Sequence, residues 1–193
     1  LPVINKQRAW ADLAQLPIID FSFVDPNRYF FQNRSCKRML HVYSSKGCTG
    51  QCTYCYNSGY AQGVWRARPA EYYIRELKWL VERYQIDGVY FVDDLLSPNR
   101  EYLQTFCKNL MDSGLNIHWS CDMRTDLCEK EDLQRMFDAG CRWIMFGIES
   151  GTPSGQEIIN KNLDLDKTKQ LMDDCDEIGI FTTITFVTGF PYQ

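Results

Sequence analysis

The sequence lacks any apolar run of the roughly 20 residues that a membrane-spanning helix needs. Residues 1–15 also lack the basic start and the apolar block of a secretory signal. Together these absences predict a cytoplasmic protein with no membrane partner. The chain begins at Leu1 rather than at a methionine, so we expect it to be a piece of a longer protein.

The sequence also has no excess of basic residues. The chain has 21 Lys and Arg against 25 Asp and Glu, which gives a formal net charge of −4. Nucleic-acid binding draws on clustered Lys and Arg, and no basic stripe is present. Nucleic acid is therefore not the expected partner.

Cysteine, by contrast, is abundant, with nine residues in the chain. The odd number and the absent export signal argue against a disulfide framework and favour a reducing compartment. Four of the cysteines lie inside apolar periodic segments. We expect these four to be buried thiols that pack as small hydrophobes: Cys107, Cys121, Cys141 and Cys175.

Strand-like and helix-like segments alternate along most of the chain. Apolar runs predict five strands, at residues 39–44, 89–94, 117–124, 143–149 and 181–187. Amphipathic periodicity predicts helices at residues 69–84, 98–113, 127–139 and 166–178, the third capped by Asp126. This alternation indicates crossover connections and a parallel sheet.

Unusual polar and glycine residues follow every predicted strand. In chain order they are a cysteine loop, Asp93-Asp94, Arg124, Glu149-Ser150 and Gly189. A β/α barrel collects its strand ends around one active site, whereas an open doubly wound sheet uses a single crevice. We therefore predict an α/β fold, an incomplete TIM-like (β/α) barrel with parallel strands.

The cysteine loop reads "CTGQCTYC" and contains Cys48, Cys52 and Cys55. Three thiolates from one short loop can hold three corners of a [4Fe–4S] cubane and leave one iron open to a small molecule. Two other interpretations remain open. One is a zinc site, although structural zinc takes four ligands, and the other is a cluster with a remote fourth cysteine.

The loop resembles the CxxxCxΦC signature of the radical S-adenosylmethionine (radical SAM) superfamily, with Tyr54 as the aromatic residue Φ. "FVDD", "GIESGTPSGQEIINKN" and "TGFP" are similar to the branch that often carries an upstream cobalamin domain. That branch includes the oxygen-independent magnesium-protoporphyrin IX monomethyl ester oxidative cyclases. The resemblance extends over residues 35–193 and implies about five of the family's six βα units.

The resemblance implies a chemistry and its participants. Cys48, Cys52 and Cys55 would bind a [4Fe–4S] cluster that reductively cleaves SAM to a 5′-deoxyadenosyl radical, which abstracts hydrogen from an unknown small molecule. A tetrapyrrole-like substrate and an electron donor such as flavodoxin or ferredoxin would be the partners. Two alternatives stay open: a non-catalytic Fe–S electron-transfer or metal-binding module, and a methylthiotransferase-like tRNA modifier.

The strand-end residues become candidate SAM ligands. Either Asp would hold the amino group of SAM, Arg124 its carboxylate, and Glu149 its ribose hydroxyls, while Gly189 would let the backbone approach the adenine. Plain alternatives are a helix cap for the Asp pair and a surface salt bridge for Arg124. The full candidate set is Tyr54, Asp93, Asp94, Arg124, Glu149, Ser150 and Gly189.

Two segments are expected. Residues 1–35, interrupted by Pro17 and Pro26, would be a lead-in or linker, and residues 36–193 a radical SAM core that stops before its sixth strand. The Asp-x-His-x-x-Gly cobalamin signature is missing, because His41 and His118 are the two histidines present. Cobalamin is therefore expected only through a domain outside this chain.

Overall fold

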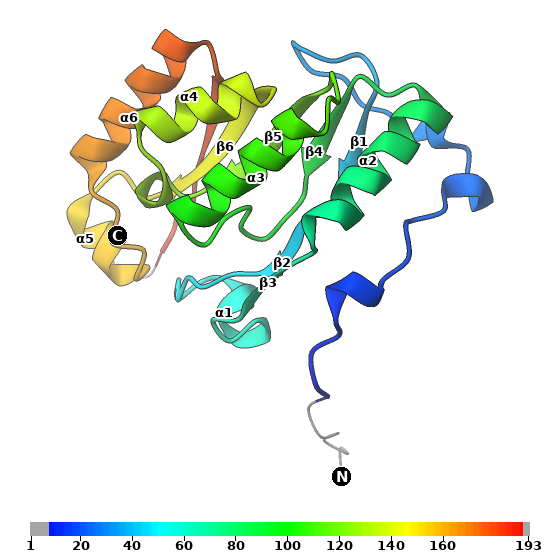
Figure 1. Ribbon diagram of the computed structural model, residues 1–193. Coiled ribbons are helices and arrows are strands. Elements are labelled where there is room, and N and C mark those ends of the chain that lie inside the picture. Colours follow the sequence, from blue (N-terminus) through cyan, green and yellow to red (C-terminus); the bar gives the residue numbers. More distant parts are fainter. Residues whose placement is uncertain (1–7, 191–193) are drawn as a thin grey trace.

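A computed structural model describes residues 8–190 of the chain. Its centre is a five-stranded parallel sheet in the order β1–β4–β5–β6–β7 (Figure 1). Its strands are β1 (Met39–Val42), β4 (Gly88–Phe91), β5 (His118–Met123), β6 (Cys141–Glu149) and β7 (Phe181–Phe186). All four residues of β4 are buried, as expected for a parallel strand inside a sheet. Strands β1 and β7 are the two edges, so within the described residues the barrel is partial, as predicted.

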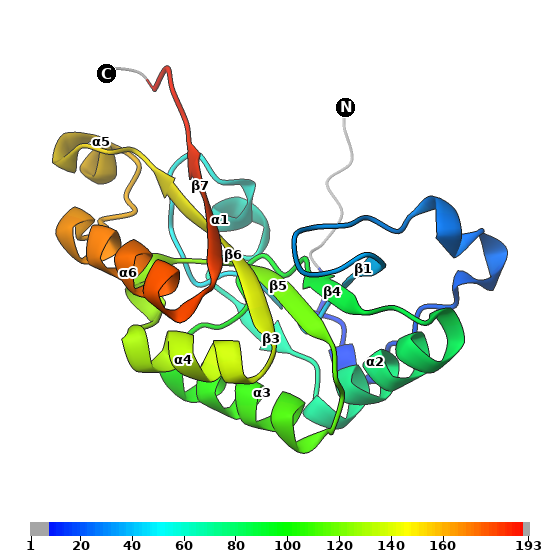
Figure 2. The ribbon, with the colours of Figure 1, turned by 90° about the horizontal axis from the view of Figure 1, so that it is seen from above.

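Phe31 and Cys36 pack against Tyr90 on one face of the sheet, and helices cover the other face (Figure 2). They are α2 (Ala70–Tyr84), α3 (Arg100–Asp112), α4 (Lys130–Asp138) and α6 (Leu165–Ile178). Each is amphipathic and buries its apolar stripe. In α2, for example, Leu77 and Leu80 are completely buried. The predicted strand–helix alternation is thereby confirmed.

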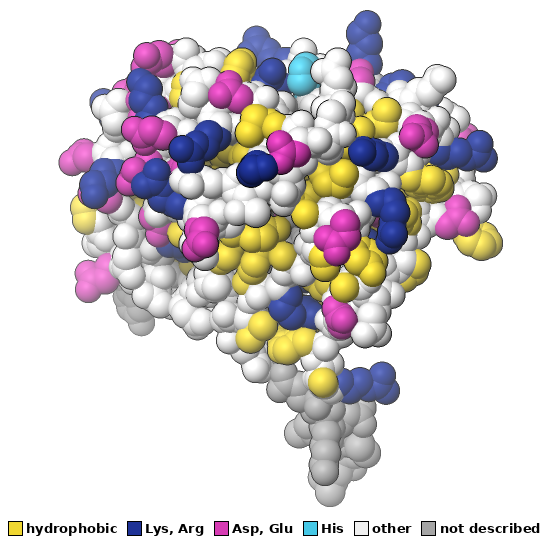
Figure 3. All heavy atoms as spheres, in the orientation of Figure 1, with side chains coloured by type: hydrophobic (Ala, Val, Ile, Leu, Met, Phe, Trp, Pro, Cys, Tyr) yellow, Lys and Arg dark blue, Asp and Glu magenta, His cyan; other side chains and the backbone are white. Residues whose placement is uncertain are grey.

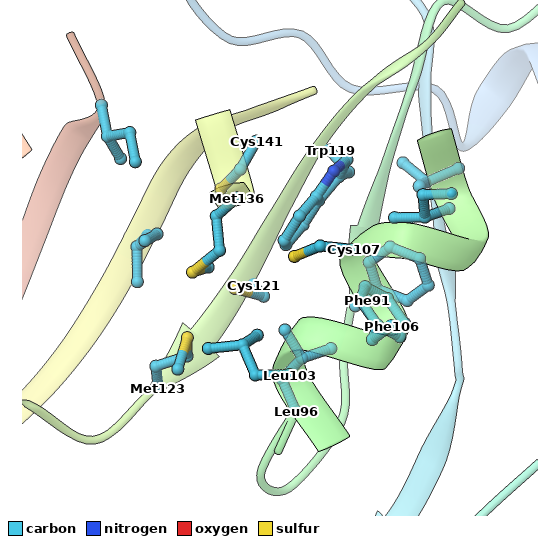
Figure 4. Packing of buried hydrophobic residues seen from close by; sticks show 14 of the residues in the cluster. Phe91, Leu96, Leu103, Phe106, Cys107, Trp119, Cys121, Met123, Met136 and Cys141 are labelled. Carbon is cyan, nitrogen blue, oxygen red and sulfur yellow. The ribbon is translucent and has the colours of Figure 1, made fainter. Parts of the chain in front are cut away.

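The main core lies between the sheet and these helices (Figure 4). Phe91 of β4, Phe106 of α3 and Trp119 of β5 form a mutual edge-to-face cluster with ring centroids 5.2–5.9 Å apart. Burial of each ring contributes roughly 1.5–3 kcal/mol before entropy is counted. The four predicted core cysteines lie in the same layer, each with at most 1% of its surface exposed. That layer holds the strands, and so the strand ends, in fixed positions.

A small two-stranded antiparallel sheet, which the sequence did not reveal, flanks the cysteine loop. Its strands, β2 (Ser45–Gly47) and β3 (Trp65–Ala67), pair antiparallel, and α1 (Tyr56–Tyr60) lies between them in the chain. Strands of three residues are too short to show a periodicity. Gly47 has φ = +93°, and a Cβ there would lie 2.1 Å from the carbonyl oxygen of Val64, so only glycine fits.

The start of α4 differs from the prediction. Asp126 does not cap this helix, because its carboxylate pairs with Arg124 within a short 3₁₀ turn, Thr125–Leu127. Glu129 and Asp132 form the capping box of α4 instead.

The remaining short elements are α5 (Pro153–Ile158) after β6 and three 3₁₀ turns in the lead-in, at Leu13–Gln15, Phe21–Phe23 and Pro26–Arg28. Phe31 of the lead-in forms an antiparallel bridge with Met39 at the start of β1. Among residues 8–190, no helix has both the length and the apolar character that a membrane crossing requires.

Candidate functional site

A cavity of about 280 Å³ lies at the carboxyl ends of the parallel strands. It gathers seven of the ten predicted site residues: Cys48, Cys52, Tyr54, Cys55, Asp94, Arg124 and Glu149. Asp93, Ser150 and Gly189 do not line it. The cysteine loop and three separate strand ends therefore share one space, as the barrel prediction required.

The three loop cysteines are free thiols. Sγ of Cys48 accepts a hydrogen bond from the backbone N–H of Gly50 at 3.3 Å. A Cβ on Gly50 would lie 3.3 Å from Sγ of Cys48 and 3.9 Å from Sγ of Cys52. Glycine thus keeps open a small cradle between two sulfur atoms.

The donor set fits an iron–sulfur cluster better than a single metal ion. Among residues 8–190, no group of three or more His, Cys, Asp or Glu side chains is placed to hold one metal ion. A cubane does not need such convergence, because each thiolate binds a different iron. Three sulfur ligands, an open glycine cradle and an adjacent cavity together suit a [4Fe–4S] cluster.

Arg124 brings positive charge to the cysteine loop. Its Nη1 lies 3.6 Å from Sγ of Cys52, and its Nη2 donates to the backbone carbonyl of Lys161 at 3.0 Å. Nε and Nη2 also pair with Asp126. The pKa of Cys48 is raised by burial, whereas the Gly50 N–H and the Arg124 charge act to lower it. The arginine therefore favours thiolate sulfur in the loop.

Glu149 ends β6 in an unusual conformation. Its φ is +67°, in the left-handed region that residues other than glycine rarely adopt, and the pairing of β6 with β7 shifts register beside it. Its Oε1 accepts from Oγ1 of Thr185 at 3.2 Å and lies 3.4 Å from Nζ of Lys161. Such backbone strain is often found at functional sites.

Gly147 makes room for this ion pair. A Cβ there would lie 2.6 Å from Oε1 of Glu149 and 2.7 Å from Nζ of Lys161. Any larger residue would displace both charged groups from the cavity wall.

The two predicted aspartates have different surroundings. Asp94 lines the cavity, and its carboxylate accepts from the Gly47 N–H and the Tyr56 hydroxyl, both at 2.9 Å. Asp93 is fully buried and binds the backbone N–H groups of Ser44 and Ser45 at 2.9 and 2.6 Å. Asp93 therefore stabilises the segment that leads into the cysteine loop. Asp94 is the aspartate that lines the cavity.

Three further candidates occupy the edges of the site. Tyr54 lines the cavity with its ring 5.7 Å from that of Phe190, and its pKa is raised by burial and by the Glu149 charge. Ser150 is buried outside the cavity beside Thr152. Gly189 has φ = +85° with open space where a Cβ would be.

The profile of the radical SAM superfamily matches residues 42–193. The chain belongs to the radical SAM superfamily. This superfamily uses a [4Fe–4S] cluster and S-adenosylmethionine, and its members include methyltransferases and cyclases.

Curated relatives and solved structures agree with this assignment. An uncharacterized methyltransferase of Pyrococcus horikoshii is 28% identical over 150 residues, which are 78% of this chain and 33% of the relative. The anaerobic magnesium-protoporphyrin IX monomethyl ester cyclase of Rubrivivax gelatinosus is 23% identical over 189 residues, covering 93% of this chain and 34% of the cyclase. The chain thus spans about a third of these relatives.

The fold also matches the cobalamin- and [4Fe–4S]-bound methyltransferase TsrM from Kitasatospora setae. The TM-score is 0.67 at 16% identity, over 81% of this chain and 32% of TsrM. Similarity at this level establishes the shared fold.

Sequence reasoning missed two charged residues of the cavity, Lys161 and Asp122. Lys161 stood within the phrase "GIESGTPSGQEIINKN", but no periodicity marked it as buried. Asp122 alternates with Cys121 and Met123 on β5, which was a usable signal, since a carboxylate between apolar residues faces the opposite side of the strand. It accepts a hydrogen bond from the Tyr90 hydroxyl.

Proposed function

We propose that this chain is the catalytic core of a radical SAM enzyme that cleaves S-adenosylmethionine reductively and abstracts hydrogen from a small molecule. The observation that carries the proposal is the convergence of three free cysteines from one loop with Arg124, Glu149 and Lys161 in one cavity. The core would comprise residues 36–193, with residues 1–35 as its lead-in.

Each cavity residue then has a role that its chemistry supports. Cys48, Cys52 and Cys55 hold the cluster, which when bound supplies one electron for cleavage of the sulfur–C5′ bond of SAM. Arg124 and Lys161 provide cations suited to a carboxylate. Asp94 provides a carboxylate suited to an ammonium group, and Glu149 provides hydrogen-bond acceptors for ribose hydroxyls.

The remaining candidates would support these roles indirectly. Tyr54 would cover the mouth of the cavity together with Phe190. Ser150 and Gly189 would shape the backbone that follows β6 and β7, and Asp93 would hold the approach to Cys48.

The reaction outcome is either methyl transfer or cyclisation on a small molecule. Methyltransferases and magnesium-protoporphyrin cyclases both occur among the relatives, and the cyclases make a tetrapyrrole the first substrate class to test. Cobalamin would act only through a domain outside this chain. The described fold shows no basic stripe that would favour the tRNA-modifying alternative, although a putatively assigned methylthiotransferase is also a relative.

The reaction needs a reducing compartment and an external electron donor. All nine cysteines are free thiols, which supports a cytoplasmic location. A flavodoxin or a ferredoxin would provide the electron.

The decisive experiment is anaerobic reconstitution with iron and sulfide, reduction with dithionite, and an assay for 5′-deoxyadenosine after addition of SAM. Wild-type protein should form this product, and the Cys48→Ala/Cys52→Ala/Cys55→Ala variant should form none. The Cys107→Ala variant is the matched control, because its thiol lies in the core. A stable cluster whose EPR signal does not respond to SAM would instead identify a non-catalytic electron-transfer module.

A further inference from the structure

An exposed aromatic surface lies beside the cysteine loop, outside the cavity. Tyr56 and Tyr60 of α1 are 69% and 65% exposed, and Trp10 of the lead-in is 36% exposed. The rings of Trp10 and Tyr60 are 6.0 Å apart and those of Tyr56 and Tyr60 are 6.2 Å apart, so the three form one continuous patch. Exposed Tyr and Trp clusters are typical of protein-binding surfaces.

Two cations extend this patch. Lys46 of β2 and Arg66 of β3 lie directly opposite one another in the two-stranded sheet, so their side chains emerge on the same face. The guanidinium of Arg66 lies 4.8 Å from the Trp10 ring centroid, which joins the cations to the aromatic residues. Figure 3 shows hydrophobic and basic side chains side by side at the lower end of the molecule, where Figure 1 places α1, β2 and β3.

No salt bridge within residues 8–190 balances the two cations of this surface. Neither Lys46 nor Arg66 forms a salt bridge with a residue in the described part of the chain. Nζ of Lys46 lies 3.7 Å from the centroid of the Tyr43 ring. Each cation therefore lacks a salt-bridge partner within these residues, which a negatively charged protein would supply. The basic pair also stands out against the net charge of −4 of the whole chain. Asp94, which binds Tyr56, supplies one negative charge at the border.

The surface is tied closely to the cysteines. Lys46 precedes Cys48 by two residues, and the chain can span at most about 7 Å over that interval. Tyr56 directly follows Cys55. None of Lys46, Arg66, Trp10, Tyr56 and Tyr60 lines the cavity, so a partner bound here would leave the cavity free for SAM and substrate.

We propose that Trp10, Lys46, Tyr56, Tyr60 and Arg66 form the docking surface for a small acidic one-electron carrier protein. The inference rests on the proposed function, because only a reductive reaction needs such a carrier. One electron passes from the reduced carrier, which is thereby oxidised, to the [4Fe–4S]²⁺ cluster, which is reduced to [4Fe–4S]¹⁺. No covalent bond forms or breaks in this step. The basic pair steers the acidic partner, and the exposed rings provide the apolar contact that holds it.

The test compares charge reversal on and away from this surface. The on-surface variant is Lys46→Glu/Arg66→Glu. The matched control is Arg75→Glu/Lys78→Glu, which makes the same charge change at exposed positions on α2. Binding of flavodoxin to each protein is measured by isothermal titration calorimetry, and cluster reduction is measured by stopped-flow absorbance with reduced flavodoxin and, separately, with dithionite.

The on-surface variant should bind flavodoxin at least about 10-fold more weakly than the control, since two interfacial charges are reversed. Its reduction by flavodoxin should slow accordingly, and by a larger factor than its reduction by dithionite, a small reductant that needs no docking surface. Flavodoxin affinity within twofold of the control would overturn the proposal. So would the absence of measurable flavodoxin binding to wild type.

A second measurement needs no variant and covers the case of a misfolded double mutant. Flavodoxin binding to wild type should weaken steadily from about 50 to about 200 mM salt, because exposed charges are screened over about 10 Å. Affinity that is independent of salt would contradict the proposal. If dithionite-reduced wild type forms no 5′-deoxyadenosine although flavodoxin binds in this manner, the proposed function fails and the docking surface stands.

Discussion

Nζ of Lys161 lies 3.4 Å from Oε1 of Glu149, and only 7% and 12% of the two side chains are exposed. The pair joins the end of β6 to the segment after α5, and both residues line the cavity. Buried charges need partners, so each holds the other in position. Gly147 leaves the space in which they meet.

The first prediction concerns this ion pair. Lys161→Met keeps the length of the side chain but leaves the Glu149 carboxylate buried without a cation. We expect SAM to bind at least about 10-fold more weakly and the free energy of unfolding to fall by about 3–5 kcal/mol. Calorimetric titration with SAM and urea unfolding measure the two effects.

The matched control for that prediction is Lys169→Met, because Lys169 is exposed on α6 and carries no ion pair among the described contacts. Lys161→Arg should restore part of both losses by returning the charge. Equal SAM affinity in Lys161→Met and Lys169→Met would show that the ion pair does not contribute to SAM binding.

The second prediction concerns Gly50. An alanine there places its methyl group 3.3 Å from Sγ of Cys48 and 3.5 Å from Nη1 of Arg124, in the space between the loop sulfurs. We expect Gly50→Ala to retain about half or less of the wild-type iron after reconstitution, because ligands must keep their geometry to hold the cluster. Iron and sulfide analysis measures this loss.

Gly59→Ala is the control for the Gly50 substitution. Nothing lies within 4 Å of a Cβ at Gly59, and its helix α1 directly follows the same loop. Its iron content should equal that of wild type. Full iron content in both variants would show that the Gly50 cradle does not matter for the cluster.

The third prediction concerns the charge next to the cluster. The guanidinium of Arg124 lies 3.6 Å from Sγ of Cys52. A nearby cation favours the reduced cluster, which carries one more negative charge, and net charge and hydrogen bonds to sulfur set the potential of such clusters. Arg124→Gln should therefore shift the reduction potential to a more negative value in an EPR-monitored redox titration.

The Arg135→Gln variant is the reference for this shift, since Arg135 is exposed on α4 and does not line the cavity. Its potential should match that of wild type. A potential for Arg124→Gln that is unchanged or more positive would show that Arg124 does not act on the cluster.

The order of strands and helices and the position of the cysteine loop could be predicted from the sequence because both depend on local patterns. A parallel strand is an apolar run, and its carboxyl end is where polar residues appear, so Glu149 and Arg124 can be identified from the sequence alone. The αL backbone of Glu149 and the position of Lys161 were not predictable, because each depends on contacts between distant segments.

The different environments of the two neighbouring aspartates could not be predicted from the sequence either. Asp93 and Asp94 are adjacent, and successive residues point in opposite directions after a strand. The sequence placed both at the strand end, but it could not decide which one faces the cavity. That choice depends on Ser44 and Ser45, which lie almost 50 residues away in the chain and bind Asp93.

The fourth prediction concerns the pH dependence of stability at Asp93. Burial raises its pKa from the ordinary 3.8 to about 7, and the hydrogen bonds from Ser45 and Ser44 lower it only in part. Between about pH 4 and about pH 7 the folded chain therefore holds this proton while the unfolded chain releases it, so this contribution to stability is lost as the pH rises. Asp93→Asn cannot ionise, and its amide matches the shape of the protonated carboxyl group.

We therefore expect wild type to lose stability relative to Asp93→Asn as the pH rises through that window, with a slope of at most about 1.4 kcal/mol per pH unit. Urea unfolding at a series of pH values measures the difference, which should level off above the folded pKa of about 7. For Asp173→Asn, at an exposed position on α6, the free energy of unfolding should change with pH in the same way as that of wild type. If wild type instead gained stability over Asp93→Asn with rising pH, the Ser44 and Ser45 hydrogen bonds would outweigh burial, and Asp93 would be an ionised anchor of the cysteine loop.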